Sequence, residues 1–155
     1  MHTMPHAHSH RLRTHRFSRV GRGYLLTTVT RNRAPVFRDF ASARLAIAEL
    51  RTCDTIGLSS TLAYVLMPDH LHWLVQLRAG TLSDLMRRFK SCSAASVNHS
   101  RGSQGQALWQ PGFHDRAVRD GQDPRTIARY IIENPLRAGL ADSIGDYPHW
   151  DVLWL

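Results

Sequence analysis

The 155-residue sequence lacks three features that would narrow its class. It has no run of eighteen apolar residues, and its basic N-terminus has no apolar segment of the kind found in secretory signals, so we expect neither membrane insertion nor export. Its two cysteines, Cys53 and Cys92, lack the CxxC spacing of a metal site, which favours free thiols in a cytoplasmic protein. Lysine is almost missing, since Lys90 is the only one.

The positive charge is therefore carried by arginine. The formal net charge is +8 and the pI is near 10.7. Guanidinium groups bind phosphates through two parallel hydrogen bonds and stack on bases, so a surface rich in arginine favours a nucleic-acid partner. A GC-rich genome would explain the preference for arginine over lysine, but it would not explain the excess of positive charge.

Length and composition predict one folded domain. With 43% hydrophobic residues the chain can bury a core of its own. We assign this domain to residues 20–155. Residues 1–19 are rich in histidine and arginine and poor in apolar residues, so we expect a flexible basic arm there.

The pattern of apolar residues and turn residues predicts the fold class. Residues typical of strands alternate with amphipathic segments in the order β-α-β-β-α-β, followed by a third helix. This order is typical of an α+β, ferredoxin-like antiparallel sheet with helices on one face, plus an additional C-terminal helix. We expect strands at 24–30, 61–67, 70–77 and 113–118, and helices at 39–57, 81–100 and 123–134.

Two histidines stand out in the third predicted strand. His70 and His72 are two residues apart, so their side chains point to the same face of a strand. Two imidazoles side by side on a rigid strand can supply half of a divalent-metal site. The alternative is a strand end with two histidines that merely face solvent.

Three motifs in this order and spacing resemble the REP-associated tyrosine transposases, stand-alone relatives of the single-tyrosine HUH transposases. The motifs are YVLMPDHLHWLV at 64–75, WQPGFHDRAVRD at 109–120 and RYIIENPLRAGL at 129–140. The resemblance covers about residues 15–155. One departure is Asp69, where the family commonly has asparagine; a carboxylate there can alter the hairpin or add charge near the histidines.

The resemblance implies a metal-dependent endonuclease and strand transferase (a transposase) acting on single-stranded DNA. Tyr130 would be the nucleophile, forming a covalent 5′-phosphotyrosine and releasing a 3′-OH. The implied substrate is a REP-type palindromic hairpin with a short 5′ guide tetranucleotide. The implied setting is the bacterial cytoplasm, at the nucleoid, with the protein as a monomer or a homodimer. Read without the motifs, Tyr130 would be a core tyrosine of a helix.

The residues themselves fit a role for Mg²⁺ or Mn²⁺. Cleavage of a phosphodiester adds negative charge to the phosphate, which a divalent cation stabilises. His70 and His72 would bind this cation, and Asn134, one helical turn after Tyr130, would supply an oxygen as the third ligand. Two alternatives remain: Asn134 can simply terminate the helix before Pro135, or Glu133 can be the oxygen donor.

Further candidates surround these motifs. His114 and Asp115 would lie beside the active site or pair to shape a strand. Four tryptophans, Trp73, Trp109, Trp150 and Trp154, can stack on unpaired bases or belong to the core. Basic residues that can contact phosphates, or can be ordinary surface residues, are Arg87, Arg88, Lys90, Arg116, Arg129 and Arg137.

Two other functions fit the same residues. One is a non-catalytic protein that binds DNA hairpins and retains the transposase fold. The other is a metal-dependent hydrolase that uses water as the nucleophile, so that Tyr130 would be incidental.

Overall fold

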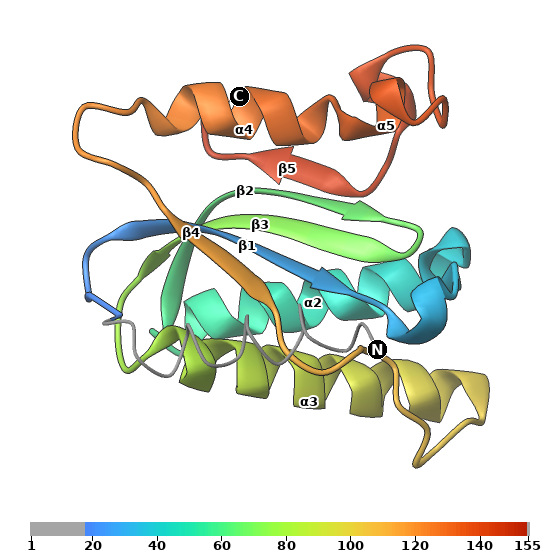
Figure 1. The fold of residues 1–155 in the computed structure, drawn as a ribbon. Coiled ribbons are helices and arrows are strands. Elements are labelled where there is room, and N and C mark those ends of the chain that lie inside the picture. Colours follow the sequence, from blue (N-terminus) through green and yellow to red (C-terminus); the bar gives the residue numbers. More distant parts are fainter. Residues whose placement is uncertain (1–17, 155) are drawn as a thin grey trace, which may run out of the picture.

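A computed structural model describes residues 18–154 of the chain, as an antiparallel sheet with helices on both faces (Figure 1). The strands lie in the order β4-β1-β3-β2-β5, and every neighbouring pair is antiparallel. The strands are β1 (Gly23–Val29), β2 (Ser59–Met67), β3 (His70–Leu77), β4 (His114–Ala117) and β5 (Trp150–Val152). The helices and 3₁₀ turns are η1 (Arg31–Arg33), η2 (Val36–Arg38), α2 (Phe40–Thr55), α3 (Leu82–Arg101), α4 (Pro124–Ile132), α5 (Asn134–Arg137) and η3 (Ile144–Asp146).

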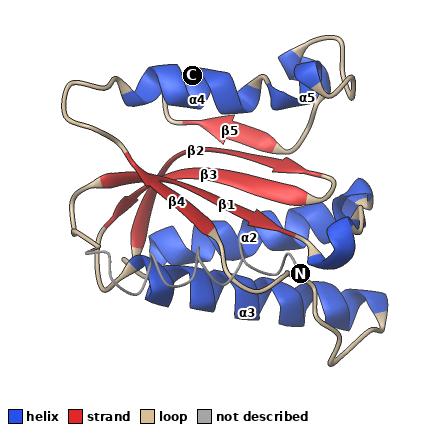
Figure 2. Cartoon of the chain, in the orientation of Figure 1, coloured by secondary structure: helices blue, strands red, loops and turns tan. Residues whose placement is uncertain are grey.

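This arrangement confirms the predicted fold class. Helices α2 and α3 cover one face of the sheet, and the additional helix α4 lies on the opposite face (Figure 2). Residues 1–17 of the predicted basic arm lie outside the described residues.

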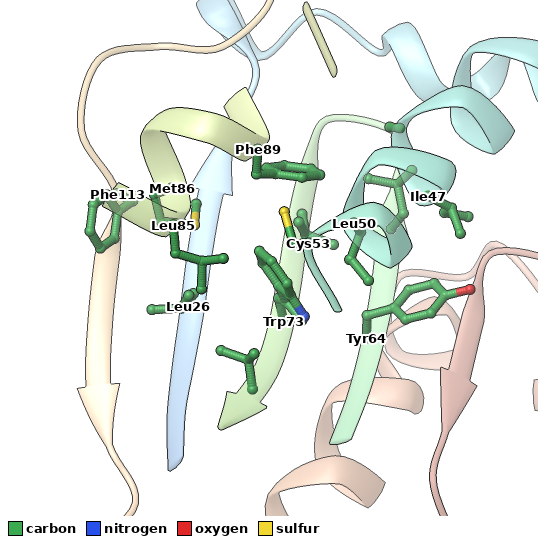
Figure 3. Close-up of a cluster of buried hydrophobic side chains, with 14 of the residues drawn as sticks. Leu26, Ile47, Leu50, Cys53, Tyr64, Trp73, Leu85, Met86, Phe89 and Phe113 are labelled. Carbon is green, nitrogen blue, oxygen red and sulfur yellow. The ribbon is translucent and has the colours of Figure 1, made fainter. Parts of the chain in front are cut away.

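Alternating residues of β3 divide the core into two layers. Leu71, Trp73 and Val75 face α2 and α3, where Trp73 is fully buried and packs against Phe89 of α3 at a centroid distance of 5.5 Å (Figure 3). Leu74 faces the other way and packs with apolar residues of α4. His70 and His72 have the same parity as Leu74, so they belong to the face that α4 covers.

The helices begin at the residues that the sequence predicts. Thr81 and Asp84 form a capping box at the start of α3. Asp39 and Asp123 cap α2 and α4 by accepting hydrogen bonds from Ser42 N and Arg125 N. Each cap satisfies backbone N–H groups that have no partner within the helix.

The C-terminal part differs from the predicted arrangement in two places. Pro135 does not end the tyrosine helix: α4 ends at Ile132, and Pro135 lies in the first turn of α5, where its missing N–H costs nothing. The apolar tail does pack back on the domain, and residues Trp150–Val152 add a fifth strand beside β2.

Two expectations concerned cysteines and membranes. Cys53 and Cys92 both carry free thiols, and burial raises the pKa of Cys53 to about 11, which keeps that thiol protonated. Among residues 18–154, no helix combines the length and the apolar composition that crossing a bilayer requires.

Candidate active site

His70 and His72 lie side by side at the start of β3, as the alternation of a strand predicts. Their ring centroids are 4.9 Å apart and the ring planes meet at 82°. Both side chains are only partly buried. The pair therefore presents two imidazoles to one small region of the α4 face.

Each imidazole is oriented by a hydrogen bond at its Nδ1 atom. Nδ1 of His70 donates to the Asp69 carboxylate at 2.7 Å, because a carboxylate accepts only. Nδ1 of His72 shares a hydrogen bond of 2.9 Å with the hydroxyl of Thr27, its cross-strand neighbour in β1. With both Nδ1 atoms engaged, the Nε2 atoms remain to bind a cation, which is how protein partners of metal-binding histidines usually act.

Asp69, the departure from the family motif, leaves the hairpin intact. Thr30 N donates to Asp69 O at 2.9 Å, and Phe37 N donates to Pro68 O at 3.0 Å, so the turn is held from two sides. The Asp69 carboxylate also accepts from Arg33 Nη1 at 3.2 Å. Partial burial opposes the charged form, but the hydrogen bonds from His70 and Arg33 outweigh it and hold the pKa of Asp69 below its usual range. Asp69 thus remains a carboxylate that orients His70.

His72 is held in its neutral form. Burial lowers its pKa to about 4, and the neighbouring His70 and the guanidinium of Arg137 add to this effect. A metal ion binds neutral imidazole, so no proton has to leave His72 near pH 7.

Tyr130 lies near the C-terminal end of α4, on the helix that covers the histidine face. Ile127, Ala128 and Ile131 are the buried side of this helix, whereas the Tyr130 side chain is 64% exposed. The interpretation of Tyr130 as a core tyrosine is therefore wrong. Its phenol is accessible to a large substrate.

Arg137 connects the tyrosine to the rest of the site. Its guanidinium carbon lies 4.0 Å from the centroid of the Tyr130 ring, within the range of a cation–π contact. Its Nη2 atom donates to Tyr130 O at 2.7 Å and to the Asn134 side-chain oxygen at 3.0 Å. Because this same guanidinium lowers the pKa of His72, Tyr130, Asn134 and the histidine pair are neighbours around one positive charge.

The break between α4 and α5 creates this arrangement. Pro135 has no N–H to continue the α4 hydrogen-bond ladder, and the chain turns at Glu133 before it resumes as α5. Asn134 and Arg137 then lie one turn apart on α5, where Arg137 can bond both Asn134 and the last turn of α4. The predicted position of Asn134 one regular helical turn beyond Tyr130 is therefore modified.

The donor set fits a divalent cation bound by two nitrogens and oxygens. Among residues 18–154, no three His, Cys, Asp or Glu side chains gather closely enough to hold a metal, so Glu133 does not join the histidine pair. Glu133 instead lies with Oε1 4.0 Å from Arg137 Nη1. Asn134 carries the oxygen donor that remains near the pair, and its assignment as a ligand stays a prediction.

The sheet separates the two neighbours His114 and Asp115. His114 pairs with Thr27 in register, and Thr27 pairs with His72, so the exposed His114 side chain shares the histidine face, two strands away. At an interstrand spacing of about 4.8 Å, its backbone is roughly 10 Å from that of His72. Asp115 pairs with Leu26 and so points to the opposite face. The prediction of a shared position beside the active site therefore fails for Asp115.

The predicted phosphate-contacting residues fall into two groups. Arg116, Arg129 and Arg137 are exposed, with Arg116 on the histidine face of β4 and Arg129 next to Tyr130. In contrast, Arg87, Arg88 and Lys90 belong to α3, on the far side of the sheet. Lys90 moreover donates to the carbonyls of Gln110 and Gly112 at 2.7 Å each, which anchors the loop before β4.

The four tryptophans also divide. Trp73 and Trp109 are buried in the core, so base stacking by them is excluded. Trp150 is partly buried and donates to Ile144 O at 2.9 Å, whereas Trp154 is 40% exposed.

The sequence gave no sign of Thr27 as a partner of His72. This contact depends on the register of β1 against β3, which only the folded sheet reveals.

Fold, histidine pair and exposed helical tyrosine together define the class of the protein. The chain belongs to the IS200-like transposases, since the family model described as "Transposase IS200 like" matches residues 21–134.

Individual relatives confirm the resemblance found in the motifs. A REP-associated tyrosine transposase of Escherichia coli K12 is 31% identical over 94 residues, which is 58% of this chain and 54% of that protein. The match thus spans about half the length of that relative. A protein of Haemophilus influenzae, provisionally given the same name, is 26% identical over 137 residues, which is 81% of this chain and 77% of that protein.

Solved structures agree with the fold. A structure of a REP-associated tyrosine transposase bound to a REP hairpin aligns with a TM-score of 0.66 at 26% identity, covering 87% of this chain and 79% of that one. A provisionally named transposase of Deinococcus radiodurans aligns with a TM-score of 0.56 at 24% identity, covering 77% of this chain and 95% of that one, and supports the fold alone.

Proposed function

We propose that this protein is a single-tyrosine transposase that cuts and rejoins single-stranded DNA at a REP-type palindromic hairpin. The observation that carries the proposal is the exposed Tyr130 on the helix that covers the histidine face, joined to that face through Arg137. The relative whose structure holds a REP hairpin supports the substrate class.

Tyr130 would act as the nucleophile. Its phenolic oxygen attacks the phosphorus, its proton passes to solvent, and the bond from phosphorus to the 3′ oxygen breaks. The products are a 5′-phosphotyrosine and a strand that ends in a 3′-OH. The same 3′-OH, or that of another strand, can attack the phosphotyrosine in reverse, so the phosphodiester energy is conserved without a cofactor that supplies energy.

Arg137 would assist this step with its positive charge. It already stacks on the Tyr130 ring at 4.0 Å, so a negative phenolic oxygen and a bound phosphate would both lie near a guanidinium. Arg116 and Arg129, exposed on the same side of the molecule, would hold neighbouring phosphates.

Mg²⁺ or Mn²⁺ would bind at Nε2 of His70 and His72, with Asn134 as the third ligand. Such an ion would stabilise negative charge on the scissile phosphate. For Asn134 to bind it, the hydrogen bond from Arg137 to the Asn134 oxygen has to open. Arg137 would then be released toward the phosphate.

The test is a denaturing gel with a 5′- or 3′-labelled hairpin oligonucleotide and Mn²⁺. Wild-type protein should give a band of DNA covalently attached to protein, and Tyr130→Phe should abolish it. Tyr64→Phe is the matched control, because Tyr64 lies in the core on the other face of the sheet and should leave the adduct intact.

Other outcomes would identify another function. Hairpin binding without any cleavage would indicate the non-catalytic DNA-binding protein. Cleavage that survives Tyr130→Phe and yields a free 5′-phosphate would indicate a hydrolase that uses water.

A further inference from the structure

A cavity of about 640 Å³ opens at the end of the sheet opposite the histidine pair. Its walls come from the residues that lead into β1, from the segment that follows β4, from the start of α4, and from Trp154. In Figure 1 this is the left-hand end, where the blue start of β1 approaches the orange connection to α4. The volume is typical of sites for small ligands or single groups of a polymer.

Arginine dominates the charge of this cavity. Arg19, Arg22 and Arg119 line it, and Asp120 is the one acidic residue among the described lining residues. Within residues 18–154, no carboxylate lies at ion-pair distance from any of these three guanidiniums. The cavity therefore offers charge that the protein itself does not neutralise.

Two of these arginines project from an ordered turn. Gly21 N donates to Leu77 O at 2.7 Å, and Gly21 O accepts from Gln76 Nε2 at 2.7 Å. Gly21 has a φ of 89°, which glycine adopts without strain, and this turn places Arg19 and Arg22 on either side of it. The guanidiniums are thus carried by backbone that is bonded to β3.

Trp154 adds an aromatic surface to the same cavity. Its side chain is 40% exposed, unlike the buried Trp73 and Trp109. An accessible indole beside guanidiniums matches one ligand group in particular, which is an unstacked base attached to a phosphate. A simple anion would leave the indole unused, and duplex DNA keeps its bases stacked on one another.

The cavity and the histidine pair share one face of the sheet. Gln76, which lines the cavity, follows His72 by four residues on β3 and has the same parity. Four residues of a strand span about 13 Å. One DNA strand rises about 3.4 Å per stacked nucleotide, so a strand held at Tyr130 reaches the cavity within a few nucleotides.

We infer that this cavity binds one unpaired nucleotide of the DNA strand, with the base stacked on Trp154 and the phosphate held by Arg22 and Arg119. The inference rests on the proposed function, because it gives the single strand that is cut at Tyr130 a second point of attachment. The protein would thereby select hairpins with a single-stranded extension over hairpins without one.

The experiment measures fluorescence anisotropy of labelled hairpins with and without a short thymidine extension on the 5′ or the 3′ side. It uses the full chain with Tyr130→Phe, in EDTA, so that binding is separated from cleavage. Trp154→Ala should weaken binding of one extended hairpin about tenfold and leave the blunt hairpin unchanged. Arg22→Gln should reduce the slope of log affinity against log salt by about 1 for the same extended hairpin.

Control variants distinguish the cavity from general effects. Leu153→Ala removes a neighbouring exposed side chain outside the cavity, and Arg101→Gln removes one positive charge from the end of α3; neither should affect the preference for the extension. Trp154→Phe keeps an aromatic ring and should retain most of the affinity. An abasic site scanned along the extension should reproduce the Trp154→Ala loss at one nucleotide and add nothing in that variant.

The outcomes separate this inference from the proposed function. Equal losses for blunt and extended hairpins, or no loss in Trp154→Ala, would overturn the inference whether or not Tyr130 forms an adduct. An extension preference that depends on Trp154, in a protein that never forms an adduct, would uphold the cavity and refute the transposase chemistry.

Discussion

Acidification should destabilise this protein through His72. The imidazole has a pKa of about 4 in the folded protein, because it is buried beside His70 and Arg137, whereas an unfolded chain gives histidine its ordinary value near 6.5. Between these two values the unfolded state binds the proton and the folded state does not. The free energy of unfolding therefore falls as the pH is lowered through this range, by about 2 kcal/mol at pH 5 and about 3 kcal/mol at pH 4.

The assay is urea unfolding in EDTA at a series of pH values from 7 to 4. His149, whose pKa burial also lowers, contributes in the same direction, so the His72 share is the difference between wild type and His72→Asn. That variant should lose about 2 kcal/mol less than wild type on going from pH 7 to pH 5. His99→Gln, at an exposed position of α3, should follow wild type. Parallel curves for wild type and His72→Asn would refute the description of His72 as a buried, neutral imidazole.

Three further predictions concern the contacts of single residues. Asp69→Ala should weaken Mn²⁺ binding, measured by calorimetry, by about 10- to 100-fold, since His70 loses the carboxylate that orients it; unchanged affinity would mean that His70 is not a ligand. Arg137→Gln should slow adduct formation in single-turnover assays by at least about tenfold with little change in hairpin affinity, because it removes the charge beside Tyr130; an effect on affinity alone would make Arg137 a simple phosphate contact. Lys90→Met should lower the free energy of unfolding by about 1–3 kcal/mol, measured by urea, because two carbonyls lose their donor; a loss of hairpin binding without a loss of stability would restore its predicted phosphate role.

Local rules predicted the parts of the site that lie within single elements. Strand alternation placed His70 and His72 on one face, and the Pro68–Asp69 turn joined β2 to β3 at the predicted residues. Asp123 marked the start of the tyrosine helix. These features depend on neighbours within a few residues, where side-chain period and cap chemistry decide the structure.

Contacts between distant elements were beyond the same rules. The register of β4 against β1 turns Asp115 away from His114, and the packing of α3 beneath the sheet removes Arg87 and Arg88 from the histidine face. No pattern in the sequence indicates that Lys90 bonds two carbonyls about twenty residues away. The position of Arg137 over Tyr130 depends on the break between α4 and α5, for which Pro135 was a sign whose result required the folded chain.

The central claim is that Tyr130 itself becomes attached to the 5′ end of the cut strand. The most direct measurement is mass spectrometry of peptides from wild-type protein, after reaction with a hairpin oligonucleotide and Mn²⁺ and digestion of the DNA by a nuclease. We predict that the peptide containing Tyr130 carries a 5′-linked nucleotide on the tyrosine oxygen. A nucleotide on any other residue, or DNA that is cut while every tyrosine peptide stays unmodified, would contradict the account.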